Sequence, residues 1–365
     1  MTELFFRFNA TYLWFVPKSV RFQPAEGIAA EPLPPGLLKA AQKIKVSPQW
    51  DQSTFTIIDS LRSEKKRVAE PGFVFAGNFI TFERNQHKPR VIHEKINVRS
   101  FEIIDTVYSF DENHIRVSTD RPYEQGKKNI LLLGCSYAFG QSVPDNETIT
   151  AFLAKDFPQY NIYNLGVPAG GLTNILNDIY YKDRISAIGK KGGAVIYEYW
   201  YDHFGRHFSD LRTLRENYPT QGTLEYQLVD GKLKATEKSG LSELKLAALK
   251  FLAKSEFLYF TGWGYNTYSM DYQKQFLDYL EFIKNYYQTE FNLEFYLFVK
   301  SQYDIPSQYF YDQLKARNIK TILYDSFTER ISAQEVTIPA DHHFNARGNY
   351  IYSQLLRKRL LADGF

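Results

Sequence analysis

The chain has 365 residues, enough for two domains or for one large domain with a substantial extension. Hydrophobic residues make up 44% and charged residues 23%, close to the averages of globular proteins, which excludes a disordered or fibrous chain. The 44 Lys and Arg against 41 Asp and Glu give a net charge of +3, and without a basic cluster this excludes a dedicated nucleic-acid binder.

The first third of the chain, residues 1–126, is predicted to be a β-rich and loop-rich extension. Prolines recur through it, and short apolar runs such as Phe73–Phe75 and Ile92–Val98 are typical of strands rather than long helices. The opening residues are aromatic, but Arg7 and Asn9 interrupt them and no small-residue cleavage site follows, so a signal peptide is not predicted. The compartment stays open. No run of about 18 apolar residues predicts a transmembrane helix.

From Lys128 the pattern changes to apolar strands that alternate with helices of apolar spacing. Strands are expected at 129–134, 161–165, 193–199, 293–299 and 321–324. Helices are expected at 145–157, 172–188, 272–287, 307–317 and 346–361. The stretch 204–264 interrupts the alternation with a predicted hairpin (224–229 and 232–234, turning at Asp230-Gly231) and a helix over 241–252. Such an alternation predicts a parallel sheet covered on both faces, with its sites at the carboxyl ends of the strands.

Ser136 follows the first of these strands, in the segment Leu133–Gly140. Between a strand and a helix, its hydroxyl would lie at the functional edge of the sheet, near backbone N–H groups that can bind an oxyanion. A Ser and Gly turn that merely ends the strand has the same local pattern.

Asp341 and His343 lie just before the last predicted helix. A carboxylate two residues before an imidazole can hold the ring in one tautomer, while the other ring nitrogen takes a proton from a hydroxyl. The adjacent His342 leaves two alternatives open, a metal site and an ordinary exposed loop. Metal binding is less favoured, because no cluster of carboxylates or cysteines nearby completes a tetrahedral set.

Together these segments resemble the SGNH (GDSL-like) hydrolases and their acyltransferase relatives. The resemblance spans roughly residues 128–365 and rests on three short blocks in the family's order: Gly134-Cys135-Ser136, Asn164-Leu165-Gly166-Val167, and Asp341-x-His343 followed by Gly348. Residues Tyr108–Arg116 also resemble the lead-in of bacterial members that carry an N-terminal extension. The resemblance implies a three-layer α/β/α flavodoxin-like domain at 127–365, with an insertion at about 204–264, after the extension at 1–126.

The resemblance further implies a catalytic triad, with Ser136 as nucleophile, His343 as base and Asp341 as the carboxylate that orients the base. The backbone N–H of Ser136 and that of Gly170 or Gly171 would form the oxyanion hole.

Two positions depart from the family pattern. Cys135 stands where the family usually has Asp, and Asp202 stands about where the family places an Asn that donates to the oxyanion. An anionic Asp202 that faced the site would repel the oxyanion, so we expect it to turn away and form an exposed ion pair with Arg206. The oxyanion hole then has either two donors only, or a third donor from another residue such as Asn174.

Two further features have simpler interpretations than a metal site or a reactive thiol. His203 and His207 are four residues apart beside Asp202, a spacing that can bind a metal on a helix. Gly205 between them and the missing glutamate of an HExxH motif favour a hydrogen-bonded loop instead. The chain's one cysteine, Cys135, lies at the end of an apolar strand, which favours a small buried residue over a reactive thiol.

We therefore expect a serine ester hydrolase that cleaves short acyl esters, such as O-acetyl groups on carbohydrates or simple carboxylic esters, without a metal or organic cofactor. The expected partners are small-molecule or carbohydrate esters, and not nucleic acid. Two alternatives stay open: an O-acetyltransferase that passes the acyl group to a glycan with the same triad, and a non-catalytic carbohydrate-binding protein whose Tyr and Trp rings stack on sugars. The oligomeric state is not predicted.

Overall fold

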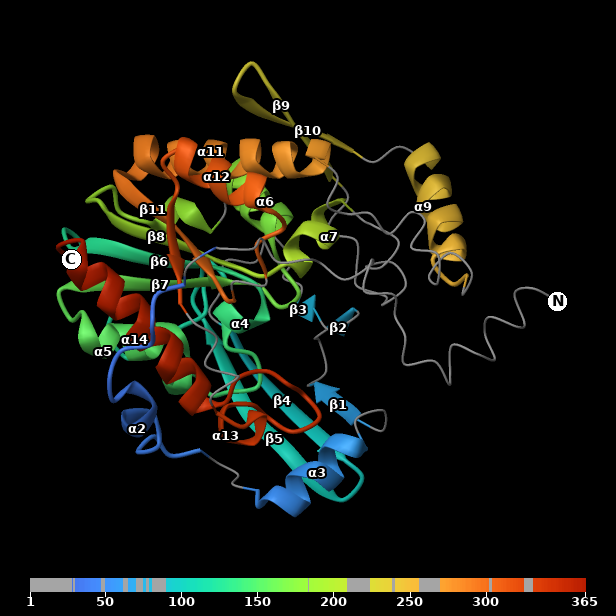
Figure 1. The fold of residues 1–365 in the computed structure, drawn as a ribbon, viewed down its shortest axis with the longest axis vertical. Helices are drawn as coiled ribbons and strands as arrows, with labels where there is room; N and C mark the ends of the chain where they lie inside the picture. Colours follow the sequence, from blue (N-terminus) through green and yellow to red (C-terminus); the bar gives the residue numbers. More distant parts are fainter. Residues whose placement is uncertain are drawn as a thin grey trace.

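A five-stranded parallel sheet forms the centre of the computed structural model (Figure 1). The structure describes residues 28, 30–46, 50–61, 65–69, 75–76, 79–80, 90–182, 184–208, 224–237, 240–255, 270–301, 304–324 and 331–365. The five strands are β6 (Lys128–Gly134), β7 (Tyr160–Gly166), β8 (Gly193–Tyr199), β11 (Leu293–Val299) and β12 (Lys320–Leu323). Their spatial order is β12-β11-β8-β6-β7, and each neighbouring pair is parallel. Counted along the chain, this is the order 2-1-3-4-5, which confirms the flavodoxin-like α/β prediction.

Helices cover both faces of the sheet because its strands are apolar on both sides. Leu131 and Leu133 of β6 face one layer, and Ile130 and Leu132 face the other. The first layer consists of α6 (Leu172–Tyr181), α11 (Met270–Phe291) and α12 (Gln308–Ala316). The second layer consists of α5 (Ile149–Asp156), α14 (Ala346–Ala362) and α2 (Leu37–Ala41). Figure 1 shows the two layers on opposite sides of the sheet.

Two predicted helices are divided, for reasons of local backbone chemistry. The helix expected at 145–157 begins instead as the 3₁₀ turn η3 (Asp145–Glu147), and α5 starts after Thr148, whose hydroxyl accepts the Ala151 N–H at 3.1 Å. The helix expected at 172–188 ends at Tyr181, because Lys182 adopts a left-handed conformation with φ of 61°. A short 3₁₀ turn, η4 (Ile185–Ala187), follows it.

The extension contains an antiparallel sheet that packs beside the start of the α/β domain. Its elements are α3 (Gln52–Ser60), β1 (Lys65–Ala69), β4 (Arg90–Val98) and β5 (Phe101–Phe110), with a separate two-stranded pair β2 (Phe75–Ala76) and β3 (Phe79–Ile80). The expected strand Ile92–Val98 lies in β4, whereas residues 73–74 of the other expected run lie outside the described residues, as do residues 1–27. The aromatic residues Tyr108 and Phe110 of β5 form a small core with Phe139, which lies three residues beyond the end of the Gly134-Cys135-Ser136 block.

The hairpin in the insertion after β8 packs on the first helix layer. The described elements of the insertion are α7 (Asp202–Phe208), β9 (Leu224–Val229), β10 (Lys232–Glu237) and α9 (Gly240–Leu252), so the second strand of the hairpin is longer than expected. Tyr226 of β9 is buried in that layer, and Tyr279 of α11 donates a hydrogen bond to its carbonyl oxygen at 2.5 Å. The hairpin therefore packs on α11, as Figure 1 shows.

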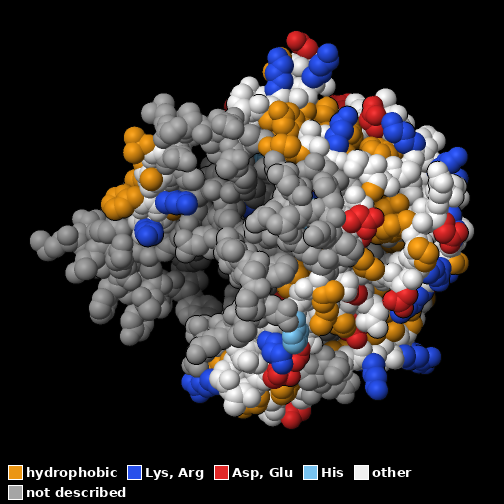
Figure 2. Space-filling model, turned by 180° about the vertical axis from the view of Figure 1, so that it is seen from behind, with side chains coloured by type: hydrophobic (Ala, Val, Ile, Leu, Met, Phe, Trp, Pro, Cys, Tyr) orange, Lys and Arg blue, Asp and Glu red, His pale blue; other side chains and the backbone are white. Residues whose placement is uncertain are grey.

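The described surface mixes both signs of charge. On the face shown in Figure 2, the coloured Lys and Arg side chains are interspersed with Asp and Glu and with apolar side chains. Among the helices that the structure describes, none combines the length and the apolar character needed to cross a bilayer.

Candidate active site

The nucleophile candidate lies on a sharp turn at the carboxyl end of β6. The strand ends at Gly134, and the short helix α4 (Ser136–Phe139) begins with Ser136 itself. Gly134 has a φ of 150°, and a Cβ atom added there would lie 2.8 Å from both Ala138 Cβ and Glu198 Oε2. Only glycine fits this turn. Because β6 has its chain neighbours β7 and β8 on either side, Ser136 lies at the topological switch point, where parallel sheets bind their ligands.

Ser136, His343 and Asp341 form a continuous hydrogen-bonded chain. His343 Nε2 lies 2.8 Å from Ser136 Oγ, and His343 Nδ1 lies 2.7 Å from Asp341 Oδ2. The Asp341 side chain is fully buried, and the His343 side chain is 19% exposed. A carboxylate at Nδ1 favours the tautomer with its proton on that nitrogen, so Nε2 is free to accept the proton of the serine.

The loop before α14 sets this arrangement. Ala340 and His342 have left-handed backbones with φ of 57° and 61°, and His342 points to Asp59 of α3, whose Oδ1 is 3.4 Å from His342 Nε2. His342 therefore lies outside the triad. After His343 the loop ends at Asn345, whose side chain accepts the N–H groups of residues 347 and 348 and caps the new helix.

Of the two alternative glycine donors that we expected after β7, Gly170 and Gly171, the structure disfavours Gly170. The Gly170 N–H already donates to Val167 O at 2.7 Å, within a tight turn. In the described part of the chain, the N–H groups of Ser136 and Gly171 have no acceptor, so these two stay the candidate donors. Asn174 lies beside the same loop, with a buried Oδ1 that has no hydrogen-bond partner among the described residues. Its role as a third donor stays a prediction.

Asp202 pairs with Arg206, but the pair is buried rather than exposed as we expected. Arg206 Nη2 lies 3.7 Å from Asp202 Oδ2, and the two side chains are 4% and 9% exposed. Arg206 Nη1 also donates to Gly170 O at 2.9 Å. The i,i+4 spacing on α7 brings the two side chains onto one helical face, and Arg206 links the pair to the glycine loop. The ion pair thus supports the loop that carries Gly171.

His203 and His207 lie on α7 rather than on a loop, and they do not converge on a shared ligand. His203 Nδ1 contacts the Tyr197 hydroxyl at 2.9 Å, and His207 Nδ1 contacts Thr173 Oγ1 at 2.9 Å. The two rings are thus held by different partners. Their hydrogen-bonding agrees with the interpretation that we preferred.

One group of potential metal ligands does occur in the described residues, and it includes Cys135, the residue before the candidate nucleophile. Ligand atoms of Cys135, Glu198 and His203 lie within 4.8 Å of one another, and all three residues are buried. This sulfur, oxygen and nitrogen set resembles the ligands of zinc. However, burial, and to a lesser degree the negative charge of Glu198, raise the pKa of the Cys135 thiol to about 12. The thiol donates a hydrogen bond to Glu198 Oε2 at 3.4 Å. Burial and the nearby cations Arg206 and Lys300 hold the pKa of His203 well below its usual value. The two adjacent cations, Arg206 and Lys300, disfavour a metal ion at this position, and the absence of a metal stays our prediction.

Lys300, at the end of β11, is a site residue that sequence patterns did not reveal. Its Nζ lies 3.7 Å from the centre of the Tyr137 ring and 4.3 Å from that of the Trp200 ring. Tyr137 in turn lies 5.3 Å from the His343 ring, centre to centre. Burial acts to lower the pKa of Lys300, but Tyr137 and the nearby carboxylates outweigh it and leave the pKa raised. A charged lysine therefore holds the aromatic residues beside the triad through cation–π contacts.

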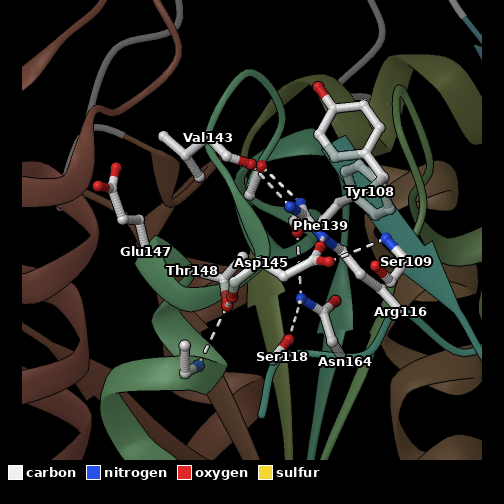
Figure 3. A network of polar contacts seen from close by, with 12 residues as sticks. Tyr108, Ser109, Arg116, Ser118, Phe139, Val143, Asp145, Glu147, Thr148 and Asn164 are labelled. Carbon is white, nitrogen blue, oxygen red and sulfur yellow. Dashed lines mark hydrogen bonds and ion pairs between the residues drawn. The ribbon is translucent and has the colours of Figure 1, made fainter. Parts of the chain in front are cut away.

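Ser142 and Arg116 are two more residues that sequence patterns missed as members of the site. Ser142 Oγ donates to Asp341 Oδ2 at 2.7 Å. Arg116, at the end of the lead-in segment, donates to the backbone carbonyls that follow α4, as Figure 3 shows. The only sequence signal was the resemblance of Tyr108–Arg116 to a lead-in block, which carried no hint of a contact with the triad.

A large cavity adjoins Ser142, the residue whose hydroxyl contacts Asp341. Its volume is about 1010 Å³, and it is lined by α3, β5 and the segments 142–147 and 332–347. It includes Ser142 but none of the three triad residues.

Comparisons with known proteins give distant likeness only. No family model and no curated protein matches the chain. Among solved structures, it is similar to a two-domain esterase active on acetylated mannans, at 14% identity and a TM-score of 0.36 over 65% of this chain and 50% of that one. It is also similar to a protein from Desulfitobacterium hafniense DCB-2 described as a G-D-S-L family lipolytic protein, at 10% identity and a TM-score of 0.34 over 64% of this chain and 99% of that one. The match spans only half the length of the mannan esterase, so the chemistry rests on this chain's own residues.

Proposed function

We propose that this protein is a serine ester hydrolase of the SGNH type, acting through Ser136, His343 and Asp341. The observation that carries the proposal is the unbroken chain of hydrogen bonds, 2.8 Å from serine to histidine and 2.7 Å from histidine to aspartate. These lengths allow direct proton transfer. The position of the serine at the switch point of the sheet adds support.

In the proposed mechanism, Ser136 Oγ attacks the ester carbonyl carbon while His343 Nε2 accepts the hydroxyl proton. The tetrahedral oxyanion would be stabilised by the N–H groups of Ser136 and Gly171. Collapse breaks the bond to the alcohol, which leaves with the proton from His343, and an acyl-serine remains. Water then attacks the acyl-serine by the same steps, with His343 as base, and releases the carboxylic acid.

We propose short acyl esters of carbohydrates as the substrate class. Support comes from the aromatic residues beside the triad: Tyr137 lies 5.3 Å from His343, and Trp200 lies 5.4 Å from Tyr137, ring centre to ring centre. Trp200 is only half-buried, so part of its ring can contact a ligand. Aromatic side chains that are partly accessible beside the triad suit the apolar C–H groups of a sugar.

The test is hydrolysis of p-nitrophenyl acetate by the full chain and by single variants. Ser136→Ala and His343→Ala should each abolish hydrolysis to a similar degree, because members of a triad act as a unit. His342→Ala is the matched control and should stay near wild type, since His342 contacts Asp59 instead. Full activity of Ser136→Ala would contradict the proposal.

The same experiment separates the alternatives. A transferase would show acetylated product when a sugar acceptor is added, with less free acetate. A non-catalytic protein would neither hydrolyse the ester nor react with a fluorophosphonate probe. In an active enzyme, Ser136 Oγ attacks the phosphorus of this probe, fluoride leaves, and the hydroxyl proton passes to His343.

A further inference from the structure

Ser142 contacts the carboxylate on which the histidine depends. Its hydroxyl donates to Asp341 Oδ2 at 2.7 Å, and the same oxygen accepts the hydrogen bond from His343 Nδ1 at 2.7 Å. Ser142 is 1% exposed, and the Asp341 side chain is fully buried. A donor in such a place fixes which way the carboxylate faces, because a buried carboxylate keeps the partners that the protein supplies.

The backbone of Ser142 is held by the N-terminal extension. Ser142 has a φ of 69°, a conformation that residues with side chains rarely adopt. Its N–H donates to the hydroxyl oxygen of Tyr108 in β5 at 2.8 Å, and that hydroxyl donates to the carboxylate of Glu94 in β4. All three residues are buried. Strands β4 and β5 of the extension therefore support the unusual conformation that points the Ser142 hydroxyl at Asp341.

Arg116 holds the rest of the segment between α4 and α5. Its Nη1 donates to the carbonyls of Phe139 at 2.7 Å and Gly140 at 2.6 Å, and its Nη2 donates to Val143 O at 2.7 Å. Its Nε pairs with Asp145 at 3.0 Å. Figure 3 shows this guanidinium enclosed by the turn, with Asn164 of β7 pointing to the same region. A fully buried arginine that satisfies three carbonyls leaves the turn little freedom.

We propose that Ser142 is a positioning residue of the active site, which extends the chain Ser136–His343–Asp341 by one member, and that the extension is a structural part of this site. This inference rests on the proposed hydrolase function. Ser142 acts through Asp341: it limits the rotation of the carboxylate, and the carboxylate in turn holds the imidazole toward the nucleophile. The role of the extension is thus to keep Ser142 in place, through Tyr108 and Arg116.

The first test removes the hydroxyl in two ways. Ser142→Ala loses the hydrogen bond but keeps a strained backbone, whereas Ser142→Gly loses the same bond and relieves the strain, since glycine accepts positive φ. Both should lower kcat for p-nitrophenyl acetate by about tenfold or more, the effect of one hydrogen bond to a charged group. KM should stay unchanged, because Ser142 acts on Asp341 and not on the substrate. Ser142→Gly should keep the melting temperature of the wild type.

The second test asks whether Tyr108 acts through Ser142. Tyr108→Phe should lower kcat several-fold by itself and add little in the Ser142→Gly background, because residues of one network show non-additive effects. Ser353→Ala is the matched control: Ser353 is a fully buried serine whose hydroxyl bonds to Tyr350 O in α14, away from the triad. Its kcat should equal that of the wild type.

Both tests can be repeated by measuring the rate of fluorophosphonate labelling. This rate does not depend on the choice of ester substrate, because the probe reacts directly with the serine. The positioning role would be overturned if Ser142→Gly kept the kcat and the labelling rate of the wild type while Ser136→Ala was inactive. The proposed hydrolase function would still stand in that case. Fully additive losses for Tyr108 and Ser142 would overturn the part assigned to the extension. A wild-type chain that neither hydrolyses ester nor takes the probe would contradict the proposed function itself.

Discussion

Gly166 lies at the end of β7, where the strand passes directly against the helix that carries the nucleophile. A Cβ atom added there would lie 2.2 Å from Phe139 N, 2.6 Å from Phe139 Cα and 2.7 Å from Ala138 C, all of them backbone atoms of α4. Ordinary contacts begin near 3.4 Å, so Gly166→Ala requires a relative shift of about 1.2 Å between strand and helix. No side-chain rotation can relieve it, because the clash is with backbone.

We expect this substitution to affect stability and activity together. Overpacking of this kind costs about 1–3 kcal/mol, which lowers the melting temperature by about 2–4 °C for each kcal/mol. Ser136 is the first residue of α4, and misplacement of a catalytic group by about 1 Å can reduce the rate about 100-fold. The assay is steady-state hydrolysis of p-nitrophenyl acetate beside a thermal melt.

Gly189→Ala is the matched control for this prediction. Gly189 is exposed, and an added Cβ would meet only Asn129 Nδ2, at 3.9 Å. This variant should therefore have the activity and melting temperature of the wild type, or slightly higher stability, because alanine has less freedom in the unfolded chain. If Gly166→Ala kept activity within about threefold of the control, the close packing of α4 against β7 would not be what positions Ser136.

Three further predictions concern buried groups around the site. Burial raises the pKa of Asp304 from 3.8 to about 7, so the folded state keeps a proton that the unfolded state loses, and stability should fall as pH rises from about 4 to 7. Asp304→Asn should remove this fall, so that its melting temperature relative to wild type rises between pH 5 and pH 8; a constant difference would contradict the raised pKa. The Cys135 thiol, buried with a pKa of about 12, should react with a disulfide reagent at pH 8 only after denaturation, and fast reaction of the native chain would show an open path to it. Asp202→Asn should lower the melting temperature by leaving Arg206 buried without its anionic partner, with no gain in kcat, whereas a gain would mean that Asp202 faces the oxyanion.

Much of the central domain follows from local sequence pattern. Buried parallel strands must be apolar on both faces, so runs such as 129–134 and 193–199 were recognisable without any tertiary information, and β8 and β11 have the predicted bounds. The candidate triad was recognisable for a related reason. A serine after one strand and an Asp-x-His before the last helix are placed at the same edge of the sheet by the α/β topology, and the structure has them hydrogen-bonded.

The tertiary structure alone decided which partner each polar group has. Gly170 looked equivalent to Gly171 in sequence, but the N–H of Gly170 already donates a hydrogen bond to Val167 O within a turn. The ion pair of Asp202 and Arg206 was expected to be exposed, yet both side chains are buried on α7. Ser142 is 199 residues from Asp341, and such a contact has no local signature. Periodicity reports which face of an element is buried, whereas contacts between distant segments depend on how the finished layers pack, and only the folded chain contains that information.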